Sequence, residues 1–215
     1  IPLTQISMGV CAFPMAHPLS LDMLGMHGTY YANMAVHHSD VLMAVGARFD
    51  DRVTGKVDMF APNAQIIHVD IDPSSITKNI PVAIPIVGDC KRVLAKLLEA
   101  VREELKSYPG GAVREARRQW HEQIAEWRTG EPLRYEWSDD VIKPQYVIEQ
   151  LSDLTKGEAF VVTGVGQHQM WTAQFYKFRS PRTFLSSSGL GTMGFGLPAA
   201  MGAQAAHPGR LVVDI

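Results

Sequence analysis

A glycine-rich stretch near the end of the chain has the spacing of a phosphate-binding turn. Residues 189–194 read GLGTMG, which matches G-x-G-x-x-G between an apolar run and a helical pattern. Asp214 follows Gly194 by 20 residues, where a dinucleotide-binding unit places an acid for the ribose. Tight packing of a strand against a helix produces similar turns. The motif alone therefore leaves NAD or FAD, another phosphate cofactor, and plain packing open.

A second glycine-rich stretch, TGVGQHQM, covers residues 163–170. Its two glycines follow an apolar run, and Gln167 and His168 stand where a helix begins. Backbone amides at a helix start, together with neutral side-chain donors, suit a phosphate group. A histidine at this position also serves often as a capping or packing residue. The stretch is a second candidate for binding a phosphate.

A third group of candidates lies in residues 23–55, in two loops. Gly25, His27 and Gly28 precede a helical pattern, and the strand-like run that follows ends in a second set: Gly46, Arg48, Asp50, Asp51 and Arg52. In parallel α/β sheets, ligands bind at the carboxyl ends of strands. The arginines and aspartates could instead form a surface ion-pair cluster.

The next two strand-like runs also end in polar groups. Asp70 and Asp72 end one run, and Gly88–Asp89 ends the following one. Three successive strand ends of this kind suit a long adenine nucleotide. His37 and His38 are interpreted as helix surface, because no third metal ligand lies near them in the sequence.

The elements that would position these residues alternate between strands and helices. Six apolar runs read as strands: 40–48, 64–72, 83–89, 158–166, 182–188 and 210–215. Most lack polar alternation, which is typical of strands covered on both faces. Asp89 can cap a following helix, Pro144 suits the first turn of another, and residues 194–206 predict a buried helix. The order predicts an α/β fold of parallel sheets with flanking helices.

The middle of the chain interrupts this alternation. From SYPGG at residues 107–111 to Lys143 there is no strand-like run. Residues 113–128 are highly charged around Trp120, Ile124 and Trp127, which predicts a solvated helix with one narrow apolar stripe. This segment is expected to link two α/β units.

The composition narrows the classes of function. The 215 residues are 46% hydrophobic with a formal net charge of −2, which argues against a nucleic-acid binder, and no apolar run is long enough to span a membrane. Cys11 and Cys90 lack metal-like spacing and make a disulfide framework unexpected. No nucleophile elbow, H-E-x-x-H motif or P-loop lysine occurs. The opening residues read as a strand in progress, so both ends are expected to be cut from a longer chain.

Five stretches together carry a family resemblance over nearly the whole chain: LGMHG, RFDDRVTG, HVDIDP, VGQHQMW and GLGTMGFGLPAA. In content, order and spacing the sequence resembles the catalytic subunit of acetohydroxyacid synthase (acetolactate synthase), a thiamine-diphosphate enzyme. The resemblance implies that residues 1–105 are the latter part of a central FAD-binding domain. It also implies a helical linker over 106–140 and the start of a diphosphate-binding domain over 141–215.

The resemblance also implies which residues contact cofactors. Those expected at FAD are Gly25, Met26, His27, Gly28, Gly46, Arg48, Asp50, Arg52, Asp70, Ile71, Asp89 and Cys90. Those expected at thiamine diphosphate are Val165, Gly166, Gln167, His168, Gly191 and Met193. Met193 would act in catalysis by wedging the cofactor into its bent form. No FAD contact is assigned in residues 4–11, where TQISMGVC departs from the family pattern.

The activity implied by the resemblance is decarboxylation of pyruvate and ligation to a second 2-keto acid, in branched-chain amino acid biosynthesis. Mg²⁺ would be bound beyond Ile215, so the chain alone is expected to be inactive. A homodimer or tetramer is expected, with a possible small regulatory subunit, in the bacterial cytoplasm rather than in a plastid or mitochondrion. The alternatives are glyoxylate carboligase, pyruvate oxidase, an NAD-dependent dehydrogenase and a binding module without chemistry.

Overall fold

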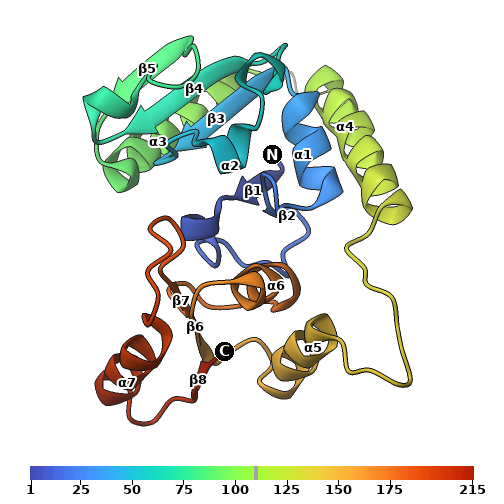
Figure 1. Cartoon of the computed structure of the whole chain (residues 1–215). Coiled ribbons are helices and arrows are strands. Elements are labelled where there is room, and N and C mark those ends of the chain that lie inside the picture. The colour runs from blue at the N-terminus through green and yellow to red at the C-terminus, as the bar shows by residue number, and fades with distance from the viewer. Residues whose placement is uncertain (109–110) are drawn as a thin grey trace. The chain divides into compact units, whose positions relative to one another are not determined.

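The computed structural model of the chain describes residues 1–108 and 111–215 (Figure 1). It divides into two compact units, one formed by residues 1–32 and 132–215 and the other by residues 33–131. Every strand pair in the described residues is parallel, and helices pack on the sheets. The predicted α/β class with parallel sheets and flanking helices is therefore confirmed. The domain boundaries expected from the sequence stay a prediction.

The unit of residues 33–131 contains a three-stranded sheet. Its elements are β3 (Val41–Val45), α2 (Asp51–Thr54), η2 (Val57–Met59), β4 (Gln65–Asp70), η3 (Pro73–Ser75), β5 (Ile84–Val87), α3 (Cys90–Ser107) and α4 (Gly111–Gly130). The strand order is β3-β4-β5, and the three strands lie side by side in Figure 1. The β3–β4 register runs without a break from Val41 opposite Gln65 to Val45 opposite Val69. All three strands fall inside runs predicted from the sequence.

Helix α3 begins where the sequence predicts it. The Asp89 side chain accepts a hydrogen bond from the Arg92 amide at 3.0 Å, which confirms the predicted cap. The apolar stripe of α3 stays open to solvent, with exposed fractions of 36% to 54% for Leu94, Leu97, Leu98, Val101 and Leu105. In the adjacent sheet, Val69 of β4 is fully buried whereas Ile84 and Val87 of β5 are exposed. The prediction of strands covered on both faces is thus wrong for β5.

Helix α4 is the charged helix predicted for the middle of the chain. Arg118 pairs with Glu115 at 2.6 Å along the solvated side, and Ile124 is buried on the other side. Trp127 stacks on His38, with ring centroids 5.4 Å apart. Pro109 and Gly110, part of the predicted break before this helix, lie outside the described residues.

The other unit carries both ends of the chain. Its elements are β1 (Leu3–Gln5), η1 (Ser7–Gly9), β2 (Ser20–Met23), α5 (Pro144–Leu154), β6 (Phe160–Thr163), α6 (Gln167–Phe175), β7 (Phe184–Ser186), α7 (Gly196–Ala206) and β8 (Val212–Asp214). Helix α1 (Tyr30–His37) carries the chain into the first unit described. The strands form a β1–β2 pair and a sheet of order β7-β6-β8. Among the described residues, no helix has the length and apolarity needed to cross a bilayer.

One hydrophobic core joins the two ends of the sequence in this unit. Buried side chains from the N-terminal segment pack with side chains that lie far along the sequence. The members are Val10, Cys11, Met15, Met23, Ile148, Ala159, Val161, Ala173, Phe175, Tyr176 and Phe178. The segment before residue 32 is therefore folded together with β6 and α6. Cys11 and Cys90 are both free thiols, as predicted.

Helix α7 differs from its prediction as a buried helix. Gly196 is its single buried residue, and Leu197 and Met201 are 65% and 66% exposed. The helix contacts β6 and β8 on one side, and its small apolar residues leave the other side open. Composition indicated a helix that tolerates burial, but it could not tell how many sides would be covered.

Candidate functional site

The turn between β6 and α6 contains two glycines, Gly164 and Gly166, directly before the helix starts. Gly166 has φ 152° and ψ −162°, a conformation that L side chains rarely adopt. A Cβ on Gly166 would lie 3.0 Å from the His168 ring, and one on Gly164 would lie 3.3 Å from His168 Nε2. The imidazole therefore folds back over the turn, and both glycines leave room for it. Gln167, at the first position of α6, is exposed.

The second glycine-rich turn lies beside the first. The Leu190 and Gly191 amides both donate to the Ser187 carbonyl at 2.9 Å, and Gly191 has φ +62°. A Cβ on Gly191 would lie 3.8 Å from Val165 Cγ1, so the two turns are in van der Waals range. The structure thus brings Gly191 close to Val165 and Gly166, which precede it by 26 and 25 residues in the sequence.

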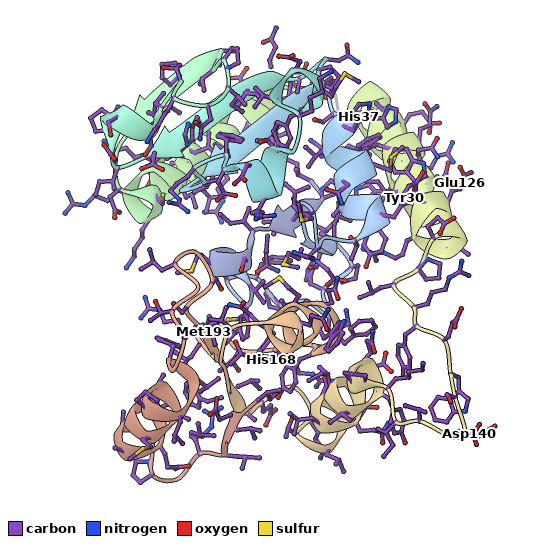
Figure 2. The ribbon with its side chains drawn as sticks, in the orientation of Figure 1. Tyr30, His37, Glu126, Asp140, His168 and Met193 are labelled. Carbon is purple, nitrogen blue, oxygen red and sulfur yellow. The ribbon has the colours of Figure 1, made fainter. Side chains whose placement is uncertain are left out.

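Met193 lies in the loop between β7 and α7, where Figure 2 labels it together with His168. Its side chain is 79% exposed, and Leu190 in the same loop is 91% exposed. A large apolar side chain held open in this way can contact a bound ring. This arrangement is compatible with the wedge role expected of Met193, which stays a prediction.

A polar network beneath the turns was missed by the sequence interpretation. The Thr163 hydroxyl donates to Ser186 Oγ at 2.9 Å, and Gln169 Nε2 donates to the same oxygen at 2.6 Å. Thr163 and Gln169 are buried. The sequence offered a signal for Thr163, a polar residue at the end of an apolar strand, but not for Gln169, because the buried side of α6 also includes the polar Thr172. The network fixes the end of β6 to β7 and to α6.

These features test the fit of a thiamine diphosphate. Gly164 and Gly166, where a side chain would crowd the His168 ring, bring the backbone to the start of a nine-residue helix, whose amides favour an anionic group. The turn therefore fits a diphosphate. Within residues 1–108 and 111–215, no three His, Cys, Asp or Glu side chains are grouped so that they could hold a metal ion.

The residues expected at FAD occupy two places. In the unit of residues 33–131, the Gly46 amide donates to the Val69 carbonyl at 2.8 Å and the Gly88 amide to the Asp70 carbonyl at 2.9 Å. These bonds continue the parallel pairing past the strand ends, so Gly46, Asp70 and Asp89 follow the same edge of the sheet. The three strand ends are thus neighbours in the sheet, and their expected contact with FAD stays a prediction.

The side chains at this edge suit part of a nucleotide. Arg48 is exposed and lies 3.5 Å from Asp50, and Ile71 is 69% exposed. A Cβ on Gly46, where φ is +65°, would lie 3.5 Å from Cys90 Sγ, which places Cys90 at the same edge. Guanidinium groups for phosphates and an open apolar side chain for a ring are the chemistry that a flavin dinucleotide needs. Arg52 lies in α2 beside this edge and is exposed.

The other FAD candidates belong to the unit of residues 1–32 and 132–215. The loop after β2 closes with the Gly28 amide donating to the Gly25 carbonyl at 2.9 Å. A Cβ on Gly28 would lie 2.5 Å from the Met23 carbonyl oxygen, so only glycine fits there. Met26 and His27 point outward at the apex, and Met26 is 62% exposed. The two groups of candidates thus lie in different units, and their joint contact with one flavin stays a prediction.

A cavity of about 500 Å³ lies elsewhere in the same unit, between the segment before α5 and the helices. Tyr135, Trp137, Glu149 and Lys177 are among its lining residues. None of the residues predicted at a cofactor lines it. The candidate site is therefore the pair of open glycine-rich turns rather than this cavity.

Two family models match parts of the chain, and one of them covers both glycine-rich turns. The family described as "Thiamine pyrophosphate enzyme, central domain" matches residues 1–97, and "Thiamine pyrophosphate enzyme, C-terminal TPP binding domain" matches residues 164–215. Thiamine pyrophosphate is another name for thiamine diphosphate. The chain belongs to the thiamine pyrophosphate enzymes.

Within that class, its relatives are acetolactate synthases. All 215 residues align at 49% identity with "Acetolactate synthase isozyme 3 large subunit" of Escherichia coli. The identity is 52% with "Acetolactate synthase 1, chloroplastic" of Zea mays and 48% with "Acetolactate synthase large subunit" of Buchnera aphidicola. The chain spans about a third of these relatives, at 37%, 33% and 36% of their lengths.

Proposed function

We propose that this sequence is part of the catalytic subunit of an acetolactate synthase. The observation that carries the proposal is the close approach of the turns at Val165 and Gly191, two positions assigned to thiamine diphosphate, in a chain similar to these enzymes over all its residues. The reaction is decarboxylation of pyruvate followed by joining of the two-carbon unit to a second 2-keto acid. The product is acetolactate or acetohydroxybutyrate, for branched-chain amino acid biosynthesis.

In this proposal the residues of the glycine-rich turns bind and orient the cofactor. Thiamine diphosphate, when bound, supplies an electron sink for the carbanion chemistry. The backbone at Val165 and Gly166 and the start of α6 at Gln167 and His168 hold its diphosphate end. Gly191 and Met193 would border its aminopyrimidine end, with the exposed Met193 side chain positioning the ring.

FAD, Mg²⁺ and the protein partners are also part of the proposal. FAD would be bound by the edge at Gly46, Asp70 and Asp89 and by the loop at residues 25–28, in a largely structural role. Mg²⁺ would take its ligands from residues after Ile215. The subunit would form a homodimer or tetramer, with a possible regulatory subunit. It would act in a bacterial cytoplasm, or in a plastid, as the names of the plant relatives say of those proteins.

The Asp214 carboxylate has a different role here from that in an NAD-binding fingerprint. Its Oδ1 lies 2.6 Å from the point that a Cβ on Gly196 would occupy, so it is directed at the start of α7. A ribose-binding role for Asp214 is therefore not part of the proposal.

The test is cofactor-dependent acetolactate formation by the protein carrying this sequence at the length of its relatives. We expect a yellow protein that converts pyruvate to acetolactate, with activity lost when thiamine diphosphate or Mg²⁺ is omitted. Activity that needs NAD and no thiamine diphosphate would contradict the proposal.

Met193 allows a matched test of the site within the same assay. Because Met193 is 79% exposed, Met193→Ala should leave stability unchanged. We expect kcat to fall by about 10- to 100-fold, since a cofactor held about 1 Å out of place reacts that much more slowly. Met201→Ala, at a position 66% exposed on α7, is the control and should keep full activity. Equal activity in both variants would remove Met193 from the site.

A further inference from the structure

Two side chains, one in the last turn of α6 and one just after the helix, contact β2 and the loop that follows it. Gln174 Nε2 donates to the His27 carbonyl at 2.8 Å. Lys177 Nζ lies 3.3 Å from Oδ2 of Asp22, which belongs to β2 and lies two residues before that loop begins. The partners are 147 and 155 residues apart in sequence, and all four residues belong to one compact unit.

The ion pair between Lys177 and Asp22 is well placed to hold the loop. The Asp22 side chain is 8% exposed and Lys177 46% exposed, so the carboxylate is buried and the ammonium only partly so. The Tyr31 hydroxyl donates to the same carboxylate oxygen at 2.8 Å. Asp22 has φ +61°, an unfavourable backbone for a residue with a side chain, which the surrounding contacts must maintain.

The start of α6 has a separate assignment. Gln167 and His168 open the helix directly after the Gly164–Gly166 turn. Because α6 is nine residues long, its two ends are about 13 Å apart along a helix rising 1.5 Å per residue. A rigid element of this length transmits a shift at one end to the other.

We propose that α6 positions both loops to which cofactors are assigned. Its first turn sets the glycine turn expected at the diphosphate. At its other end, Gln174 holds the Gly25–Gly28 loop expected at the flavin, and Lys177, just after the helix, holds the end of β2 from which that loop leaves. Gln174 and Lys177 are positioning residues, since they act through the loop. The flavin part of this inference rests on the proposed function, whereas the positioning of the loop does not.

The first experiment measures amide hydrogen exchange in the loop, in the protein at the length of its relatives. Gln174→Met removes the donor at nearly constant size, and we expect exchange in residues 24–28 to quicken about 2- to 10-fold, the worth of one neutral hydrogen bond. Gln204→Met is the matched control, because Gln204 likewise donates from its side chain to backbone carbonyls, those of His207 and Arg210. In Gln204→Met, amide exchange in residues 24–28 should not change.

Two substitutions of Lys177 distinguish a loss of loop positioning from a general loss of stability. Lys177→Met leaves the buried Asp22 carboxylate without its cation and should quicken loop exchange more than Gln174→Met. Lys177→Arg keeps the charge and should restore most of the protection. Exchange in β6 should stay unchanged throughout, because its bonds to β7 and β8 do not involve Lys177.

The second experiment measures FAD and thiamine diphosphate binding to the apoprotein by flavin fluorescence and calorimetry. We expect the FAD Kd to rise about 2- to 10-fold in Gln174→Met, in step with loop exchange, and the thiamine diphosphate Kd to change less than about 2-fold. Unchanged loop exchange in both Gln174→Met and Lys177→Met would overturn the inference. Faster exchange without FAD binding, even in the parent protein, would support the positioning role and overturn the flavin assignment alone.

Discussion

Gly196 lies where three chain segments approach one another most closely in the candidate site. A Cβ there would be 2.6 Å from Asp214 Oδ1 and 2.9 Å from the Gly164 amide nitrogen. The second of these is a backbone atom in the middle of a glycine turn, so it cannot move without moving the turn. The residue is also the single buried position of α7. Gly196 therefore couples the start of α7 to the turn expected at the diphosphate.

Replacing Gly196 with alanine should disturb that turn. We expect Gly196→Ala to lower the free energy of unfolding by about 1–3 kcal/mol, as overpacking does, and to weaken thiamine diphosphate binding. Gly202→Ala is the matched control on the same helix, because nothing lies within 4 Å of its Cβ position. That variant should gain up to about 1 kcal/mol from helix propensity. Urea unfolding measures both, and a neutral Gly196→Ala would show that the contact is relaxed.

For single residues, the sequence was sufficient where the interaction partner lies only a few residues away. Asp89 was identifiable as a cap because a capping side chain needs only the amide three residues ahead. Gly196 and the Lys177–Asp22 pair were not identifiable, since their partners lie far along the chain. Cys11 is an intermediate case. The sequence indicated only that TQISMGVC departs from the family pattern, whereas the structure shows that Cys11 has φ +67°, in the region that favours glycine.

At the scale of elements, one hydrogen bond ties the segment before α5 to that helix. The Tyr135 hydroxyl donates to Glu149 Oε2 at 2.7 Å. This bond to the Glu149 carboxylate, with some burial, raises the pKa of Tyr135 to about 12. The tyrosine ring also packs edge-on against Phe175, with centroids 5.7 Å apart. The segment leading into α5 is thus fixed to both α5 and α6.

The raised pKa gives a pH dependence with a definite sign. Because the folded pKa lies above the unfolded value of 10.0, the stabilisation is fully present below pH 10 and is lost as the pH rises toward about 12. Absorbance at 295 nm should show one tyrosine titrating near pH 12, which Tyr135→Phe removes. In Glu149→Gln the same tyrosine should titrate nearer 10.0. A titration unchanged by Glu149→Gln would exclude Glu149 as the cause.

Elements were predicted best where the apolar pattern is local. The strands β3, β4, β6 and β8 and the helices α3 and α5 appear within the runs that indicated them. Burial was predicted less well, because it depends on what packs against an element. The apolar composition of α7 and β5 indicated coverage, yet Met201 and Val87 are exposed. The residue types of an element indicate whether its surface is apolar enough to be buried. Whether that surface is buried depends on the elements that pack against it.

At the scale of the whole molecule, contacts do not follow the order of the sequence. Residues 1–32 cluster with residues 132–215, although the central-domain match runs continuously over residues 1–97. The reason lies in the core, where Met15 and Met23 pack with Phe175, Tyr176 and Phe178. Hydrophobic periodicity reports which residues are buried but does not report their partners, so this arrangement could not be read from the sequence.

The shared core predicts that a change near the N-terminus destabilises the C-terminal segment. Met23 is 3% exposed, and Met23→Ala should cost about 2–4 kcal/mol of unfolding free energy. Trp171, which packs against this core, should report the loss through its fluorescence during urea unfolding. Met201→Ala, at a position 66% exposed, should change stability by less than about 0.5 kcal/mol. If Met23→Ala and Met201→Ala had equal urea midpoints by Trp171 fluorescence, the N-terminal and C-terminal segments would unfold independently of each other.

The open stripe of α3 has a consequence for colloidal behaviour. Five apolar side chains lie along one face of an 18-residue helix, and all are at least 36% exposed. Exposed apolar surface of this kind promotes aggregation and binding by holdase chaperones. Preparations of the 215-residue chain should scatter more light as concentration or ionic strength rises, since salt screens the charges beside the stripe but not the leucines themselves.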